Sequence, residues 1–123
     1  MQRATTALLV ALVLLPCMAQ AHAKLVQSAP ANGSTLNAPP ANVTLVFNEA
    51  ATLTALSILK SGDREARKLG PLPKAPAAKF TVALPVLAGG SYSLSYRVLS
   101  DDNHVMSGTT KFTIAADARP SAK

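Results

Sequence analysis

Between residues 91 and 99, apolar and polar side chains alternate with a period of two. The apolar positions of this run are Tyr92, Leu94, Tyr96 and Val98. This period predicts a β-strand with one face in a core and the other in water. A shorter run at residues 79–84 alternates in the same way, and Gly89 and Gly90 mark a turn just before the longer run. We therefore expect these two runs to form a hairpin.

Other apolar runs of strand length occupy the rest of the chain after residue 24. They lie at residues 25–26, 43–47, 52–59 and 110–114. Proline-containing segments at 30–33, 39–40 and 70–78 cannot donate fully to a strand ladder and predict loops. No segment gives a convincing helical period. Six or seven strands at this spacing predict an all-β fold, either an antiparallel sandwich or a small barrel.

The first 21 residues account for an imbalance in composition. Hydrophobic residues make up 49% of the chain and charged residues 15%, whereas charged residues make up roughly 25% of an ordinary globular protein. Arg3 is followed by an apolar core at residues 7–15, a proline and then small residues. This pattern is typical of a cleavable secretory signal peptide. Its apolar core is shorter than the about 20 residues that cross a bilayer, so we do not expect a membrane-embedded protein.

Two cleavage sites fit the small-residue rule. A cut after Ala21 makes His22 the first residue, whereas a cut after Ala23 removes that histidine. Either cut removes Cys17, the only cysteine, so the exported chain would have no disulfide and no thiolate ligand. Pro16 makes lipid attachment at Cys17 a poor alternative. We expect a signal peptide at 1–21, one domain at 22–115 and a flexible tail at 116–123.

Composition and motifs exclude several classes of function. The net charge is +6, but the basic residues are scattered apart from Arg64, Arg67 and Lys68, so they do not indicate a nucleic-acid partner. The chain has no glycine-rich phosphate loop, no Gly-x-Ser-x-Gly and no His-Glu-x-x-His. Nothing in the sequence places a Ser-His-Asp triad. We therefore expect a binding protein rather than an enzyme.

The two histidines carry the remaining chemistry. An N-terminal His22 would offer its α-amine and its imidazole to one metal ion, and nitrogen donors of this kind favour Cu(II) among divalent first-row metals. His104 follows Asp102 in a predicted loop after the strand at 91–99, where residues two apart can point the same way. Their carboxylate and imidazole would complete a four-donor site. Taken alone, an Asp-x-His sequence is also typical of an exposed turn.

Four ordered segments of the sequence resemble the CopC family of periplasmic copper-binding proteins. They are residues 22–25, 28–34, 43–49 and 92–108. The resemblance implies a seven-stranded, Ig-like Greek-key β-sandwich and cleavage after Ala21. It also implies one Cu(II) per chain, held by His22, Asp102 and His104. Glu49, in the Phe-x-Glu segment of the family, would lie near this site in an outer shell or be an exposed carboxylate at a strand end.

The same resemblance implies a function. We expect a periplasmic Cu(II) carrier or buffer in copper homeostasis or resistance, monomeric, with an inner-membrane copper importer of the CopD type as its partner. The Cu(I) site of some relatives needs a Met-rich loop; here Met106 is the only methionine after the leader, so we expect no such site. Tyr96 replaces a frequent Trp of the family and should change core packing.

Two other functions stay open. One is a copper-dependent oxidase or oxygenase that uses the same N-terminal histidine. The other is a metal-free Ig-like interaction module, for which His22 and His104 would be dispensable.

Overall fold

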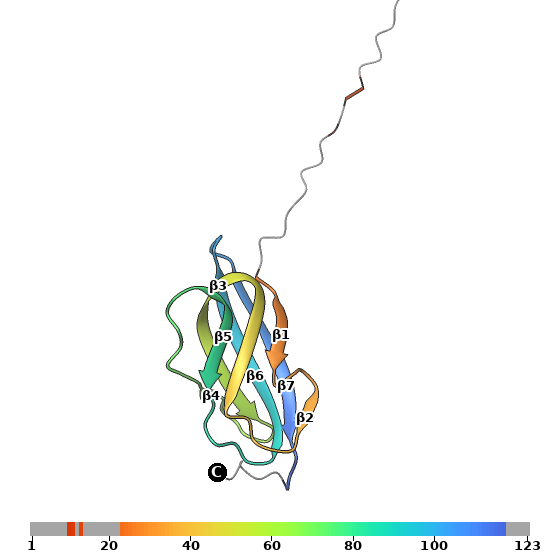
Figure 1. The fold of residues 1–123 in the computed structure, drawn as a ribbon, viewed down its shortest axis with the longest axis vertical. Coiled ribbons are helices and arrows are strands. Elements are labelled where there is room, and N and C mark those ends of the chain that lie inside the picture. Colours follow the sequence, from red (N-terminus) through yellow and green to blue (C-terminus); the bar gives the residue numbers. More distant parts are fainter. Residues whose placement is uncertain (1–9, 12, 14–22, 118–123) are drawn as a thin grey trace, which may run out of the picture.

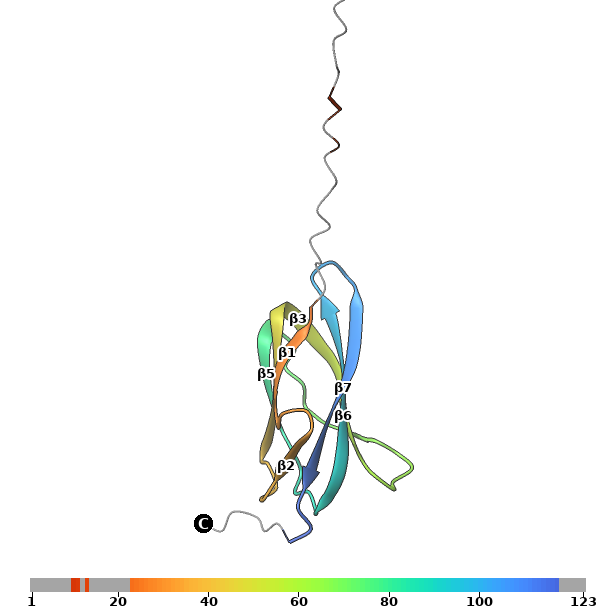
Figure 2. The same cartoon turned by 90° about the vertical axis from the view of Figure 1, so that its right-hand side faces the viewer.

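The computed structural model describes residues 10, 11, 13 and 23–117. Its strands are β1 (Leu25–Ala29), β2 (Ser34–Leu36), β3 (Asn42–Lys60), β4 (Arg67–Lys68), β5 (Ala77–Ala83), β6 (Gly90–Ser100) and β7 (Val105–Ile114). They form two facing layers whose strands run roughly along the long axis of the molecule (Figures 1 and 2). The all-β sandwich expected from the sequence is confirmed. Among the residues described, no helix is long and apolar enough to span a membrane.

Strand β3 belongs to both layers. Its first half pairs with β1 and β5, and its second half pairs with β6. Between the halves, the pairing with β5 shifts register between Val46 and Ala51, and the strand curves over one end of the sandwich (Figure 1). The separate strands expected at 43–47 and 52–59 are therefore one strand. The polar residues Asn48 and Glu49 interrupt the apolar alternation without ending the strand.

The expected hairpin between residues 79–84 and 91–99 is wrong. β5 pairs with the first half of β3, with Phe80 opposite Leu45, whereas β6 pairs with the second half of β3 and with β7. The two runs therefore lie in different layers, and the segment containing Gly89 crosses from one to the other. Alternation predicts which side chains of a strand face the core, but it does not identify the strand's neighbours.

The short strand β2 departs from the expected pattern in two ways. It lies between the two predicted loops at 30–33 and 39–40, where no strand was expected, and it pairs parallel to β7, with Ser34 opposite Phe112. The other pairings are antiparallel. Gly33 turns the chain into β2 with a φ of 83°, in the left-handed region that favours glycine. Its amide donates to the Lys111 carbonyl over 2.7 Å.

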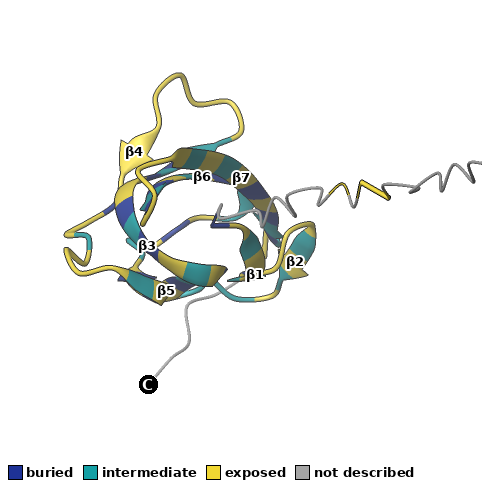
Figure 3. Ribbon diagram, turned by 90° about the horizontal axis from the view of Figure 1, so that it is seen from above, coloured by how far each residue is buried: buried dark blue, intermediate teal, exposed yellow. Residues whose placement is uncertain are grey.

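The core lies between the two layers. Buried and exposed residues alternate along the strands that enclose it (Figure 3). The largest fully buried side chains are Leu45, Ile58, Leu94, Ile114, Val43 and Val98. Phe47 packs edge-on against Phe80 and against Tyr96, with ring centroids 6.1 and 5.6 Å away. The Tyr96 ring lies over Gly108 on β7, where an added Cβ would overlap the tyrosine hydroxyl. Met106 is half-buried against this core.

The expected signal peptide at 1–21 lies almost entirely outside the described residues, and so does most of the expected tail at 116–123. The last described segment remains attached to the sandwich, because the amide of Ala115 donates to the carbonyl of Leu36 over 2.9 Å.

Candidate metal centre

Three segments meet at one end of the sandwich: the start of β1, the bend of β3 and the turn between β6 and β7 (Figures 1 and 2). The amide of Asn48 donates to the carbonyl of Lys24 over 2.9 Å. A few residues further along β3, Ala51 pairs with Ser100, the last residue of β6. The same short stretch of β3 therefore holds both the beginning of the described domain and the base of the β6–β7 turn.

Backbone hydrogen bonds close the β6–β7 turn, which spans residues 101–104. The amide of Ser100 donates to the carbonyl of His104 over 2.9 Å, and the amide of Asn103 donates to the carbonyl of Ser100 over 3.0 Å. Asn103 has a φ of 64°, a left-handed conformation that asparagine tolerates better than most residues. The turn thus presents Asp102 and His104 together at the tip of the two strands.

Asp102 and His104 are in direct contact. Oδ2 of the carboxylate lies 2.9 Å from Nδ1 of the imidazole, and the aspartate and histidine side chains are 34% and 58% exposed. The sequence predicted that residues two apart in this loop could point the same way, and the structure brings them together. Both side chains remain accessible to an ion from solvent.

A hydrogen bond from Ser100 favours the ionised form of Asp102. The hydroxyl of this buried serine donates to Asp102 Oδ1, and this hydrogen bond is the main cause that lowers the pKa of Asp102 below its ordinary value of 3.8. Partial burial opposes the shift, and the neighbouring His104 adds to it. A carboxylate that is already ionised at neutral pH has no proton to lose when a cation binds.

The other two predicted site residues are His22 and Glu49. His22 lies outside the described residues. Glu49 is half-buried on β3, in the bend at the same end of the sandwich. Within residues 10, 11, 13 and 23–117, no group of three or more His, Cys, Asp or Glu residues could hold a metal ion. The described part of the chain therefore contributes two candidate donors, Asp102 and His104.

Ser100 was not predicted from the sequence, although a signal was present. Even-numbered residues of β6 face the core, and position 100 continues that series with a polar side chain that is 3% exposed. A buried hydroxyl requires a hydrogen-bond partner, and the partner here is the candidate ligand two residues further along. Asn48, which anchors the start of β1, was also missed, because its partner is 24 residues away in sequence.

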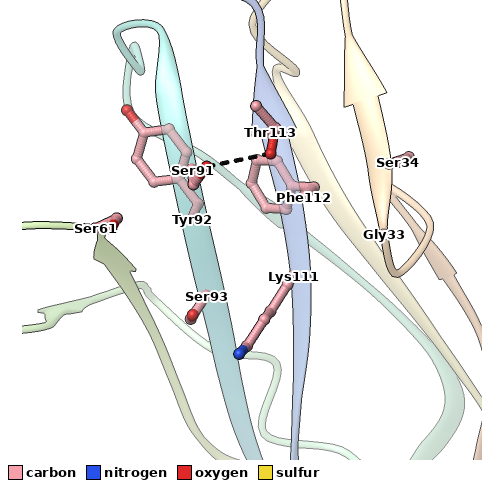
Figure 4. A pocket seen from close by; sticks show the side chains of 9 residues that line it. All are labelled: Gly33, Ser34, Ser61, Ser91, Tyr92, Ser93, Lys111, Phe112 and Thr113. Carbon is pink, nitrogen blue, oxygen red and sulfur yellow. Dashed lines mark hydrogen bonds between the residues drawn. The ribbon is translucent and has the colours of Figure 1, made fainter.

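The pocket drawn in Figure 4 lies away from this turn, where β6 begins and β7 ends. Hydroxyl groups dominate it, and the hydroxyl oxygens of Ser91 and Thr113 lie 3.3 Å apart across the two strands. Among the described residues that line it, Lys111 is the one charged side chain, with no His, Cys, Asp or Glu. This pocket therefore adds no metal donor to the pair on the turn.

The fold and the turn together define a small β-sandwich protein with a candidate metal-binding pair at one end. Residues 25–115 match the family described as CopC domain. The chain belongs to the CopC family, which confirms the resemblance drawn from the sequence.

Relatives match along most of the chain. Copper resistance protein C of Xanthomonas campestris pv. juglandis is 34% identical over 120 residues, which cover 90% of this chain and 94% of that protein. Copper resistance protein C of Pseudomonas syringae pv. tomato is 28% identical over 111 residues, with coverages of 83% and 87%. The crystal structure of CopC from Methylosinus trichosporium OB3b aligns with a TM-score of 0.66 and 28% identity, covering 83% of this chain and 98% of that one.

Proposed function

We propose that this protein binds one Cu(II) ion per chain and serves as a copper carrier or buffer in copper homeostasis or resistance. The observation that carries the proposal is the contact between Asp102 and His104 at the end of the sandwich where β1 begins. The relatives named copper resistance protein C support copper as the cargo. The proposed ligands are the α-amine and imidazole of His22, the carboxylate of Asp102 and the imidazole of His104.

The geometry of the pair fits two neighbouring ligands of one ion. Two donors at right angles, each about 2.0–2.1 Å from a metal, lie about 2.9 Å apart. Asp102 Oδ2 and His104 Nδ1 have this separation. Three nitrogens and one carboxylate oxygen form a donor set suited to Cu(II). The two donors already lie side by side, and binding would replace the proton between them with the ion.

The beginning of the described domain supports a terminal ligand at position 22. Ala23 is 2% exposed and belongs to the core, and Lys24 is hydrogen-bonded to β3. A chain cut after Ala21 would therefore begin one residue before a fixed point of the sandwich. Ordering such a terminus around a metal involves few rotatable bonds, so its entropic cost is small.

The proposed setting follows from the leader and from the family. Residues 1–21 would direct export to the periplasm and be removed, leaving a domain at 22–115. We expect a monomer that passes copper to an inner-membrane importer of the CopD type. The role is binding rather than oxidation, because Asp102 would fill the fourth donor position that an oxygen-activating copper site leaves open.

The test uses protein exported and purified with its natural N-terminus. Mass spectrometry should show that the chain begins at His22, and titration against a competing chelator should give one Cu(II) per chain. Asp102→Ala and His104→Ala should each weaken binding strongly, whereas Asp101→Ala, which removes the exposed neighbouring carboxylate, should not. A chain that begins at Lys24, or one that begins at His22 and does not bind Cu(II), would overturn the proposal.

A further inference from the structure

We infer that Ser100 is a positioning residue that presents Asp102 to the metal site through a single carboxylate oxygen. The inference rests on the proposed function and adds a residue that is not one of the proposed ligands. Ser100 ends β6 and is 3% exposed. It pairs with Ala51 of β3, which is fully buried. Its side chain is therefore held between the core and the turn, away from competing water.

The polar groups of Ser100 all face the turn that carries the candidate ligands. Its amide donates to the His104 carbonyl, and its own carbonyl accepts from the Asn103 amide. Its hydroxyl donates to Asp102 Oδ1, and the oxygen of this hydroxyl also lies 3.1 Å from the carbonyl oxygen of His104. A hydroxyl has one proton, and an ionised carboxylate is a stronger acceptor than a carbonyl. Ser100 thus fixes both the backbone of the turn and the orientation of the carboxylate.

This arrangement leaves one Asp102 oxygen for a metal. Oδ1 is engaged by Ser100, while Oδ2 faces Nδ1 of His104 at 2.9 Å. Without the hydroxyl, the backbone amides of His104 and Asp102 would be the remaining backbone donors to the carboxylate, which could rotate about its terminal torsion because that torsion has a broad minimum. It could then turn Oδ2 away from His104 or offer both oxygens to the ion. A donor that holds a ligating carboxylate in this way typically changes metal affinity by about 10- to 100-fold.

β6 offers a matched control. Ser95 is an exposed serine on the same strand, and its hydroxyl contacts Thr109 on the outer face of the sheet, 3.2 Å away. Ser95→Ala therefore removes the same group from the same strand without touching the turn. Ser100→Thr keeps a hydroxyl at position 100 and provides the conservative rescue.

The experiment measures Cu(II) affinity by chelator competition and the copper environment by electron paramagnetic resonance. Ser100→Ala should still bind one Cu(II), but about 10- to 100-fold more weakly and with altered copper hyperfine coupling. Ser100→Thr should restore both affinity and spectrum, and Ser95→Ala should change neither. An unchanged affinity and spectrum in Ser100→Ala would overturn the inference.

A double-mutant comparison separates positioning of Asp102 from a general effect on the turn. If Ser100 acts through Asp102, then Ser100→Ala should cause no further loss of affinity in protein that already carries Asp102→Ala. An equal loss in both backgrounds would mean that Ser100 acts through the backbone of the turn, and the inference would be wrong.

A measurement without metal distinguishes failure of this inference from failure of the proposed function. In the metal-free protein, the carboxyl ¹³C shift of Asp102 should move in Ser100→Ala and stay in place in Ser95→Ala. If unaltered protein beginning at His22 bound no Cu(II), the proposed function would fail, and this shift would still decide whether Ser100 orients Asp102. No movement of the shift in Ser100→Ala would refute the positioning role.

Discussion

Lys24 and Asn48 are joined by two hydrogen bonds. The Lys24 amide donates to Asn48 Oδ1 over 2.7 Å, and the Asn48 amide donates to the Lys24 carbonyl over 2.9 Å. This double contact ties the chain just before β1 to the bend of β3. It therefore fixes the part of the chain from which a ligand at position 22 would extend toward Asp102 and His104.

Asn48→Ala should loosen this attachment and weaken Cu(II) binding. The loss of one hydrogen bond lowers the free energy of unfolding by about 0.5–1.5 kcal/mol, and the affinity should fall by at most the corresponding factor of about two to ten. Chelator competition measures the affinity, and thermal unfolding of the metal-free protein measures the change in stability. Asn42→Ala, at the exposed start of β3, is the control and should leave the affinity unchanged. A wild-type affinity in Asn48→Ala would show that the anchor does not position the terminus.

One extra residue before His22 should weaken Cu(II) far more than any change at Asn48. The extension keeps every side chain but moves the α-amine away from the imidazole that would complete the chelate. Breaking a chelate into separate binding events typically lowers affinity by about 10²- to 10⁴-fold. The same residue added after Lys123 is the control. Equal affinities of the two extended proteins would mean that the terminal amine is not a ligand.

The two tyrosines should titrate above their ordinary pKa of 10.0. Burial raises the pKa of Tyr96, and burial followed by the nearby charge of Asp63 raises that of Tyr92, against a smaller opposing effect of Arg67. Tyrosinate absorbance reports these two residues alone, since the chain has two Tyr and no Trp. Its midpoint should lie above pH 10 in the native protein and near pH 10 after unfolding in guanidinium chloride.

These raised pKa values also predict the sign of a stability change. The folded state keeps its phenolic protons to higher pH than the unfolded state, so the tyrosine contribution is complete below pH 10 and is lost as pH rises through the folded pKa. The denaturant midpoint should therefore fall above pH 10. Tyr96→Phe should make that fall shallower. A midpoint that does not change between pH 9 and pH 11 would contradict the burial of these phenols.

Gly108→Ala should destabilise the sandwich, because the new Cβ would overlap the Tyr96 ring. Overpacking of this kind costs about 1–3 kcal/mol, measurable as a lower urea midpoint with an unchanged m-value. Gly70→Ala is the control, since a Cβ there meets only the Leu72 amide nitrogen at an ordinary 3.6 Å. Combining Gly108→Ala with Tyr96→Leu should cost less than the sum of the two single changes. Strict additivity would mean that the two positions do not compete for space.

The sequence predicted the faces of the strands better than their partners. Alternation around Leu94 and Val98 assigned the buried side of β6 correctly, because the pleat of a strand depends only on local geometry. Pairing depends on contacts between distant residues, so it was missed that β5 pairs with β3 and that β2 lies parallel to β7. Cross-strand partners such as Phe80 and Leu45 carry no mark of one another in a single sequence.

The candidate site was predicted in part for the same reason. Asp102 and His104 are two residues apart, so local spacing was sufficient to suggest that they meet, and they lie in contact. The assignment of His22 as a ligand stays a prediction, since that residue lies outside the described part of the chain. Asn48 is hydrogen-bonded to Lys24, 24 residues away in sequence, a separation that no local pattern reports.

β3 is a continuous strand of both layers. The two layers therefore cannot separate by a hinge motion unless β3 loses its pairing with β5 or with β6. In the proposed role, a copper ion bound at this end of the sandwich would therefore be exchanged with an acceptor while the scaffold beneath it keeps its shape. An acceptor would need to reach only the tip, and transfer would not require the protein to unfold.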